Sequence, residues 1–344
     1  SKSPPRRSAG VGRLAPWIAC VTIADNPPMR QPKPPNPRWS NAAFRAIIPL
    51  PPGHGPAAEA RREMDDELAR LRGHWGGRGD IDRIGADVAR KGGDPARPSA
   101  EELAAHDQLH AGALDGTRGF VDWIAPAPDE RVLDLGAGLG GAARWLASRA
   151  GARVTAVEPV PELHRAASEL TRRQDLAARV RHVCSLAGDL DLDERFDTVL
   201  VQHVEMQVAD KPAFYASARR HLRAGGRICF HDWLAGAGPP PRYPVFWSED
   251  GALCRLSRRE DLGALLARNA IELARFEPIE ARTTAWFERA RSGVAAALDR
   301  ARRHGGPVDP ARRARLARLA AEIENILVNI ERGSMIPFFA EARG

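Results

Sequence analysis

The stretch RVLDLGAGLGGAARWLA, residues 131–147, decides the fold of this chain. Residues 131–135 form an apolar run broken by one carboxylate, which predicts a short buried strand, and the end of the stretch predicts a helix. Between the two lie Gly136, Gly138 and Gly140, and glycine lets a backbone turn sharply and approach a ligand closely. A glycine turn between a strand and a helix N-terminus is typical of a site for a nucleotide-like ligand.

Two carboxylates frame this turn. Asp134 ends the first predicted strand, and Glu158 follows a second one, residues 153–157, twenty-two positions after Gly136. A carboxylate after the second strand can accept hydrogen bonds from a ribose diol, which suits NAD and S-adenosylmethionine equally. Asp134 favours S-adenosylmethionine, because a carboxylate directly before the turn can hold the amino group of a methionine moiety.

The composition narrows the class of protein. The 344 residues carry 51 basic and 44 acidic side chains, a net charge of +7 that is spread along the chain, whereas nucleic-acid binding needs a concentrated basic face. The four cysteines form no CxxC pair, which argues against a disulfide framework or a zinc knuckle and indicates a reducing cytoplasm. No apolar run approaches the roughly 20 residues that span a bilayer, and we expect no signal peptide.

The chain divides into three predicted parts. Residues 1–56 hold 13 of the 28 prolines, which predicts a disordered tail. Residues 57–125 predict a helical cap over the ligand cleft, beginning with a helix whose Met64, Leu68, Leu71 and Trp75 share one face. Residues 126–344 predict an α/β fold, a doubly wound and mostly parallel sheet, with a lid loop at 234–256 and a helical insertion at 279–332.

The remaining elements follow from apolar runs and capping residues. Further strands are predicted at residues 179–184, 196–201, 227–230, 271–276 and 335–340, and helices at 57–75, 99–110, 115–123, 161–175, 210–222, 261–269, 284–303 and 310–332.

From His106 onward the chain resembles the class I S-adenosylmethionine-dependent methyltransferases, in particular the sarcosine and dimethylglycine N-methyltransferases. The matching motifs are QLH at 108–110, GLGG at 138–141, QHVEMQVADK at 202–211 and RYPVFW at 242–247. The resemblance implies a Rossmann-like fold with S-adenosylmethionine as methyl donor and S-adenosylhomocysteine as product. Gln207 and Ala111 stand where the family usually has Asn and Gly, which leaves the acceptor open.

The resemblance also implies a set of site residues. The cofactor would be held by Asp134, Gly136, Ala137, Gly138, Glu158, Ser185, Leu186 and Gln202. The acceptor would lie beside Gln108, His110, His203, Glu205, Met206, Trp233, Tyr243 and Trp247. We expect no metal, because His106 and His110 have no third ligand nearby in the sequence.

His203 and His110 are the candidates for a catalytic base, which a hydroxyl or a protonated amine would need and a tertiary amine would not. Trp233, Tyr243 and Trp247 could surround a methylammonium ion through cation–π attraction. Two plainer alternatives stay open: His203 could merely cap its strand, and the aromatic residues could be ordinary loop packing.

The leading hypothesis for function is a methyltransferase acting on the nitrogen of a small amine or N-methyl amino acid, as a monomer or homodimer. The alternative is C- or O-methylation of a prenyl diphosphate or another natural-product intermediate, and the third is a cofactor-binding protein without catalysis. Nucleic-acid methylation is not favoured, because the sequence after residue 201 lacks the Asn/Asp-Pro-Pro-aromatic pattern that holds a flipped base.

Overall fold

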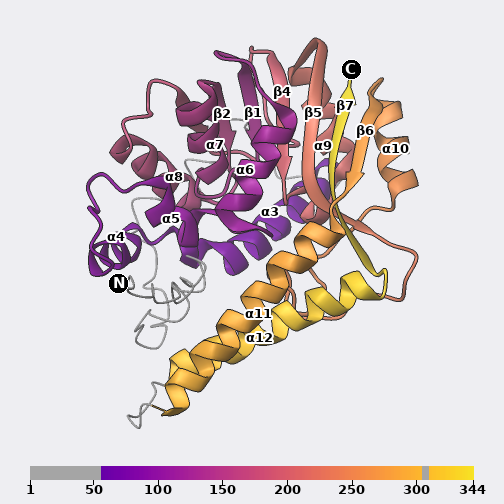
Figure 1. Ribbon diagram of the computed structural model, residues 1–344. Coiled ribbons are helices and arrows are strands. Elements are labelled where there is room, and N and C mark those ends of the chain that lie inside the picture. The colour runs from indigo at the N-terminus through magenta and orange to yellow at the C-terminus, as the bar shows by residue number, and fades with distance from the viewer. Residues whose placement is uncertain (1–55, 304–309) are drawn as a thin grey trace, which may run out of the picture.

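The computed structural model describes residues 56–303 and 310–344, so the expected tail lies almost wholly outside the described residues. The chain forms one seven-stranded sheet with helices on both sides (Figure 1). The strands are β1 (Arg131–Leu135), β2 (Arg153–Val157), β3 (Val180–Val183), β4 (Phe196–Gln202), β5 (Leu222–Ala235), β6 (Glu272–Pro278) and β7 (Met335–Arg343).

The strand order is β3-β2-β1-β4-β5-β7-β6, and only β7 runs antiparallel to its neighbours. The order reverses between β1 and β4, and in open α/β sheets ligands bind beyond the carboxyl ends of the strands at such a point. This arrangement confirms the predicted fold class, a doubly wound and mostly parallel Rossmann-like sheet.

The helices fall into three groups along the chain. Before β1 come α3 (Pro56–Trp75), the 3-10 helix η2 (Gly76–Gly79), α4 (Ile81–Arg90), α5 (Ala100–Asp107) and α6 (Ala113–Ile124). Between the strands come α7 (Gly141–Trp145), the π-helical turn η3 (Leu146–Ala150), α8 (Pro161–Arg173), the 3-10 turn η4 (Glu205–Gln207), α9 (Lys211–His221) and α10 (Arg259–Arg268). Between β6 and β7 lie α11 (Glu280–Arg303) and α12 (Pro310–Glu331). Helix α4 has no counterpart in the sequence prediction.

The central strands bury both faces, as parallel strands covered by helices do. In β1, Leu133 and Leu135 join the core that contains α9 and α10, whereas Val132 joins the core that contains α6 and α7. Successive side chains of a strand point to opposite faces, so one apolar run supplies two cores.

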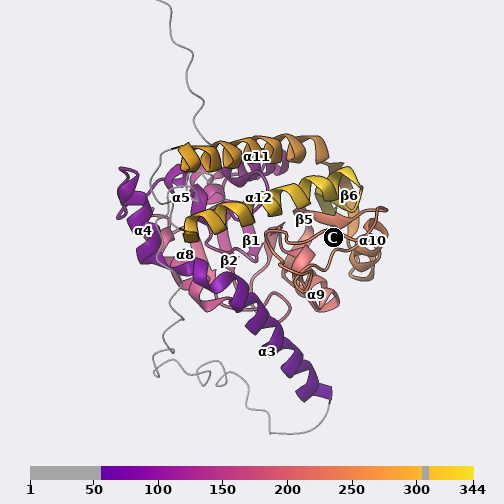
Figure 2. The same cartoon turned by 90° about the horizontal axis from the view of Figure 1, so that it is seen from below.

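Helix α3 crosses beneath the sheet at the carboxyl ends of the parallel strands (Figures 1 and 2). Several polar contacts attach it to the rest of the chain. The indole Nε1 of Trp75 donates to Gln207 at 3.1 Å, Arg255 pairs with Glu67 at 3.1 Å, and Arg72 pairs with Glu162. The helix therefore forms a cover over the edge where a ligand is expected.

Strand β5 is much longer than the predicted strand at 227–230. It reaches from Leu222 to Ala235 because β7 pairs with its second half, from Arg227 opposite Arg343 to Ala235 opposite Met335. His231, Asp232 and Trp233 therefore lie within a central strand rather than after its end, and the loop expected from residue 234 begins two residues later.

Phe338 of β7 provides a test of this pairing. Its buried ring lies 5.2 Å from the ring of Phe276 and 6.4 Å from that of Phe230, so Phe338→Ala leaves a cavity between three strands. We expect a loss of about 3–5 kcal/mol in the free energy of unfolding, measured by urea denaturation. Arg343→Ala, at an exposed position of the same strand, should cost less than about 0.5 kcal/mol. Equal losses in both variants would contradict the pairing.

Candidate functional site

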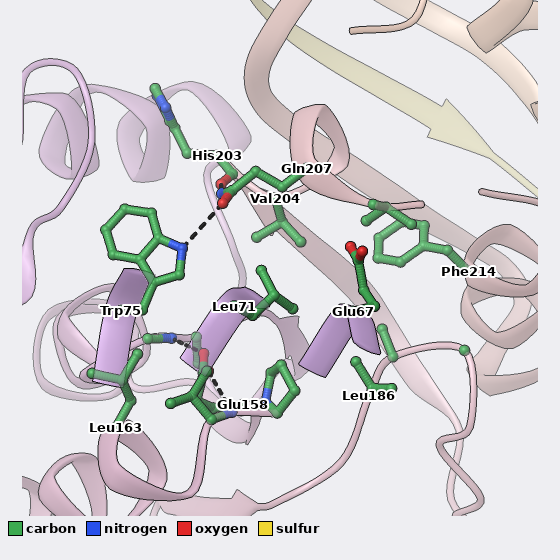
Figure 3. Close-up of a pocket in the computed structure, with 18 of the residues that line it drawn as sticks. Glu67, Leu71, Trp75, Glu158, Leu163, Leu186, His203, Val204, Gln207 and Phe214 are labelled. Carbon is green, nitrogen blue, oxygen red and sulfur yellow. Dashed lines mark hydrogen bonds between the residues drawn. The ribbon is translucent and has the colours of Figure 1, made fainter. Parts of the chain in front are cut away.

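A cavity of about 860 Å³ lies at the carboxyl edge of the sheet, under α3 (Figure 3). Its wall is built from the glycine turn after β1, the ends of β2 and β4, the loop after β3, the start of α9 and one face of α3. This is where the strand order reverses, and the volume is in the range of small-molecule sites.

The glycine turn presents its backbone to this cavity. Gly136 and Gly138 both have positive φ, +75° and +56°. A Cβ on Gly136 would lie 2.4 Å from a methyl carbon of Val204, whereas a Cβ on Gly138 would meet nothing within 4 Å. The space beside Gly138 is therefore open, as the cradle of a ligand requires.

Glu158 at the end of β2 closes the other side of this turn. Its Oε2 accepts from the backbone N–H of Gly138 and its Oε1 from that of Val160, each at 2.9 Å. A carboxylate has about four acceptor positions, so two remain for ligand hydroxyls. Burial raises the pKa of Glu158 to about 7 in the ligand-free protein, although the two backbone donors act in the opposite direction.

Two further carboxylates of the cavity wall each have an oxygen without a hydrogen-bond partner among the described residues. Asp134 lacks one at Oδ2, and Asp107 lacks one at Oδ1, while its Oδ2 accepts from Arg144 at 2.6 Å. Burial, and then the charge of Glu158, raise the pKa of Asp134 to about 7. Buried acceptors without donors are what a cationic ligand group such as an ammonium would satisfy.

Three histidine rings pack together behind and beside the cavity. The ring centroids of His203 and His231 lie 4.6 Å apart, and His110 lies 5.4 Å from the first and 5.6 Å from the second. Burial lowers the pKa of all three, that of His110 to about 4, so the rings are neutral at pH 7. His110 and His203 line the cavity, whereas His231 does not.

One nitrogen of each ring lies within 4.8 Å of the other two, which raises the question of a metal. The indole N–H of Trp233 donates to Nδ1 of His203 at 3.2 Å, so the proton of the neutral ring is on Nε2, 3.3 Å from Nε2 of His231. A metal ligand needs a lone pair at that nitrogen and a proton at the other one. The donor set therefore does not fit a metal ion, and the rings form a hydrogen-bonded cluster.

The turn after β4 that carries His203 is held by Asp232. His203 has a positive φ of +57°, which is unfavourable for a residue with a side chain. Asp232 Oδ2 accepts from the backbone N–H groups of Val204 at 2.9 Å and Glu205 at 2.8 Å, and thereby fixes the next peptide units. Asp232 was not among the site residues predicted from the sequence.

The site residues predicted from the sequence divide into three groups in the structure. Nine lie in the cavity wall: Asp134, Gly136, Ala137, Gly138, Glu158, Leu186, Gln202, His110 and His203. Two lie directly behind it. Gln108 is buried and lies 3.0 Å from His110 through its side-chain oxygen, and the hydroxyl of Ser185 donates to the carbonyl of Leu186.

The other five predicted residues lie in the protein interior, away from the cavity wall. Glu205 is buried and accepts from the hydroxyl of Ser257 at 2.6 Å and from Lys211 at 2.9 Å. The rest pack in the hydrophobic cluster formed with α11 and α12: Met206, Trp233, Tyr243 and Trp247. The physical reason is the length of β5, which places Trp233 within the sheet and directs the following loop against the two helices.

Helix α3 supplies wall residues that the predicted site did not include. Leu71 and Trp75 point into the cavity from above, with Glu67 on the same helix (Figure 3). Their signal was present in the sequence as an apolar helical face, which the analysis assigned to a cap without naming contacts. Asp107 had a signal as well, because it directly precedes the matching motif at 108–110.

Comparison with known proteins shows that part of the chain matches a protein family. Residues 133–230 match the family described as a methyltransferase domain. A sarcosine/dimethylglycine N-methyltransferase of Halorhodospira halochloris is 32% identical over 106 residues, which cover 30% of this chain and 38% of the relative. A phosphoethanolamine N-methyltransferase of Triticum aestivum is 26% identical over 132 residues, which cover 38% of this chain and 26% of the relative. The chain thus matches less than half the length of these curated relatives.

Solved structures share the architecture. A putative sarcosine dimethylglycine methyltransferase from Galdieria sulphuraria superposes with a TM-score of 0.55 and 16% identity, covering 67% of this chain and 85% of that one. A second structure is phosphoethanolamine N-methyltransferase 2 of Haemonchus contortus in complex with phosphomonomethylethanolamine and S-adenosylhomocysteine. It superposes with a TM-score of 0.59 and 18% identity, covering 71% of this chain and 56% of that one. At such identities the likeness establishes the fold alone. Among the described residues, no helix combines the length and apolar character that a membrane crossing requires.

The raised pKa of Asp134 predicts a pH dependence of stability. The unfolded carboxyl loses its proton near pH 4, whereas the folded one keeps its proton up to about pH 7. The contribution of Asp134 to stability is therefore full below pH 4 and is lost as the pH rises to about 7. We expect Asp134→Asn to raise the free energy of unfolding of the ligand-free protein at pH 8 by on the order of 1–3 kcal/mol and to flatten its pH profile.

Urea denaturation between pH 5 and pH 8 measures this effect. The matched control is Asp122→Asn, at an exposed position on α6, which should leave the profile unchanged. Parallel profiles for the wild type and Asp134→Asn would contradict the assignment.

Proposed function

We propose that the protein is a class I S-adenosylmethionine-dependent methyltransferase that transfers a methyl group to the nitrogen of a small amine, from the premise that residues 133–230 match a methyltransferase domain. The observation that carries the proposal is the cavity in which the glycine turn, Asp134 and Glu158 share one wall with His110 and His203. Two similar proteins, from Halorhodospira halochloris and Triticum aestivum, are N-methyltransferases by name, which supports nitrogen as the atom methylated.

The wall residues fit the methyl donor. Glu158 has acceptor positions left for the two ribose hydroxyls, and the open space beside Gly138 admits a ligand close to the backbone. The unpartnered oxygen of Asp134 would accept from the ammonium group of the methionine moiety. Leu186 and Phe214 offer an apolar surface on the opposite side of Glu158, where the adenine would pack (Figure 3).

S-Adenosylmethionine, when bound, supplies a methyl group on a positively charged sulfur with a neutral thioether as leaving group. The protein therefore has to orient the acceptor nitrogen and exclude water. Helix α3 covers the cavity, and Gln202, His110 and His203 lie at the ends of the elements beneath it. These three residues are the groups we assign to orienting the amine.

His110 bears its proton on Nδ1, which donates to the carbonyl oxygen of Ala111 at 3.1 Å, and the lone pair of its Nε2 faces the hydroxyl of Thr117 at 3.0 Å. With a pKa of about 4, this ring is a poor acceptor for the proton of an ammonium ion. The acceptor therefore enters as the free base, its lone pair forms the new N–C bond, and the product leaves as an ammonium ion. In this proposal His110 and His203 position the nitrogen rather than carry its proton.

Isotope-labelled S-adenosylmethionine tests the function directly. The protein is incubated with the labelled donor and a panel of primary, secondary and tertiary amines, and products are identified by mass spectrometry. We expect one labelled methyl group on an amine for each S-adenosylhomocysteine formed. Binding of S-adenosylhomocysteine without transfer to any amine would instead support a cofactor-binding protein without catalysis. Transfer to carbon or oxygen acceptors alone would support a C- or O-methyltransferase.

Glu158→Ala tests the ribose contact. Removing an acceptor from charge-assisted hydrogen bonds costs on the order of 1.5–3 kcal/mol, so S-adenosylhomocysteine should bind about ten- to a hundred-fold more weakly in isothermal titration calorimetry. Glu169→Ala removes a partly exposed carboxylate of α8 that pairs with Arg172 and Arg173, away from the cavity wall, and should leave the dissociation constant unchanged. An unaltered constant in a folded Glu158→Ala variant would show that the ribose is held elsewhere.

A further inference from the structure

We infer that the acceptor amine carries no anionic group: no carboxylate, phosphate or diphosphate. The inference rests on the proposed function and narrows it. Phosphoethanolamine, sarcosine and dimethylglycine are all amines that carry an anionic group. The inference therefore separates this chain from the similar proteins that are named for these compounds. It also excludes a prenyl diphosphate, the alternative acceptor class considered from the sequence.

The charge of the cavity wall is the first observation. Among the described residues, carboxylates line the cavity from several elements, but no lysine or arginine does. They include Glu67 of α3, Asp107 at the end of α5, Asp134 of β1 and Glu158 after β2. An anionic acceptor would therefore find hydrogen-bond acceptors in this wall but no lysine or arginine to pair with.

Two arginines are paired with carboxylates of the cavity wall. Arg144 lies behind Asp107 and contacts it at 2.6 Å, both side chains being almost fully buried. Arg255 lies behind Glu67 at 3.1 Å. A ligand carboxylate would compete with a protein carboxylate for either arginine, and for Arg144 this means disturbing a buried ion pair, which is strongly unfavourable.

The unpartnered oxygens form a second, independent observation. Asp107 is buried, lines the cavity and has no hydrogen-bond donor for Oδ1 within the described part of the chain. The two histidines of the wall supply no positive charge, because His110 and His203 are neutral at pH 7. The wall thus offers hydrogen-bond acceptors to a positively charged or neutral ligand. It offers no positively charged side chain to a negatively charged ligand.

Apolar side chains make up another part of the acceptor's surroundings. Leu71 and Trp75 line the cavity from α3, Leu109 from the segment after α5, and Val204 and Val208 from the segment after β4. These side chains suit an alkyl or aryl substituent on the amine, since burial of apolar surface is the attraction they provide. The acceptor class that fits is an alkyl- or arylalkylamine.

A matched series of acceptors tests this inference. N-methylbenzylamine, its 4-carbamoyl derivative and its 4-carboxy derivative have similar size and differ in charge. We expect the first two to have kcat/KM values within about ten-fold of each other and the carboxylate to be lower by at least about a hundred-fold, measured by formation of S-adenosylhomocysteine. The pair sarcosinamide and sarcosine should show the same preference.

The outcomes separate this inference from the proposed function. Equal or better turnover of the carboxylates would overturn the inference and leave amine methylation in place. Failure to methylate any amine, in protein that binds S-adenosylhomocysteine, would overturn the proposed function and the inference with it.

A charge introduced into the wall gives a second test. Gln207 lines the cavity beside Trp75, so Gln207→Lys places an ammonium there, and Gln207→Met removes the same hydrogen bond without adding charge. We expect the lysine variant to raise the kcat/KM of the carboxylate relative to N-methylbenzylamine by about ten-fold or more, and the methionine variant to leave that ratio unchanged. A ratio that the lysine does not move would contradict the inference.

Discussion

The carboxylate of Asp232 is the constraint on which the site depends. One of its oxygens accepts from the two peptide N–H groups that follow His203, and the other accepts from the N–H of Trp233. The turn after β4 is thereby fixed although His203 occupies an unfavourable region of φ. Because Asp232 itself lies in a strand paired on both sides, the position of His203 is set by the central sheet and not by a surface loop.

This fixed turn also determines how the cavity is covered. Gln207, at the end of the 3-10 turn, accepts from the indole N–H of Trp75, and its own amide lies 3.3 Å from the carbonyl oxygen of His203. One glutamine therefore joins the floor of the cavity to helix α3. A side chain that shapes the acceptor end of the site also holds its cover, so substitutions there change access and specificity together.

The local parts of this arrangement were predictable from the sequence and the non-local parts were not. The glycine turn, Asp134 and Glu158 could be located because strand, turn and helix follow each other within 30 residues. The length of β5 could not, since half of its pairing comes from β7, about a hundred residues later. The prediction therefore ended this strand at residue 230, whereas it continues to Ala235. Helix α4 was missed although Ile81, Ile84 and Val88 lie at helical spacing, because the segment is short, contains Gly85 and has glycine-containing segments on both sides.

The order of the strands in the sheet determines when each strand can find its partner during translation. Strand β7 lies between β5 and β6, so β6 has no partner in the sheet until the α11–α12 hairpin has been made and the chain has returned. Until then β5 presents an unpaired edge, and the apolar side chains that β7 later covers are open to other chains. The nascent chain is therefore most prone to aggregation between the synthesis of β5 and that of β7, and chaperone contact during that interval would protect a central strand of the sheet.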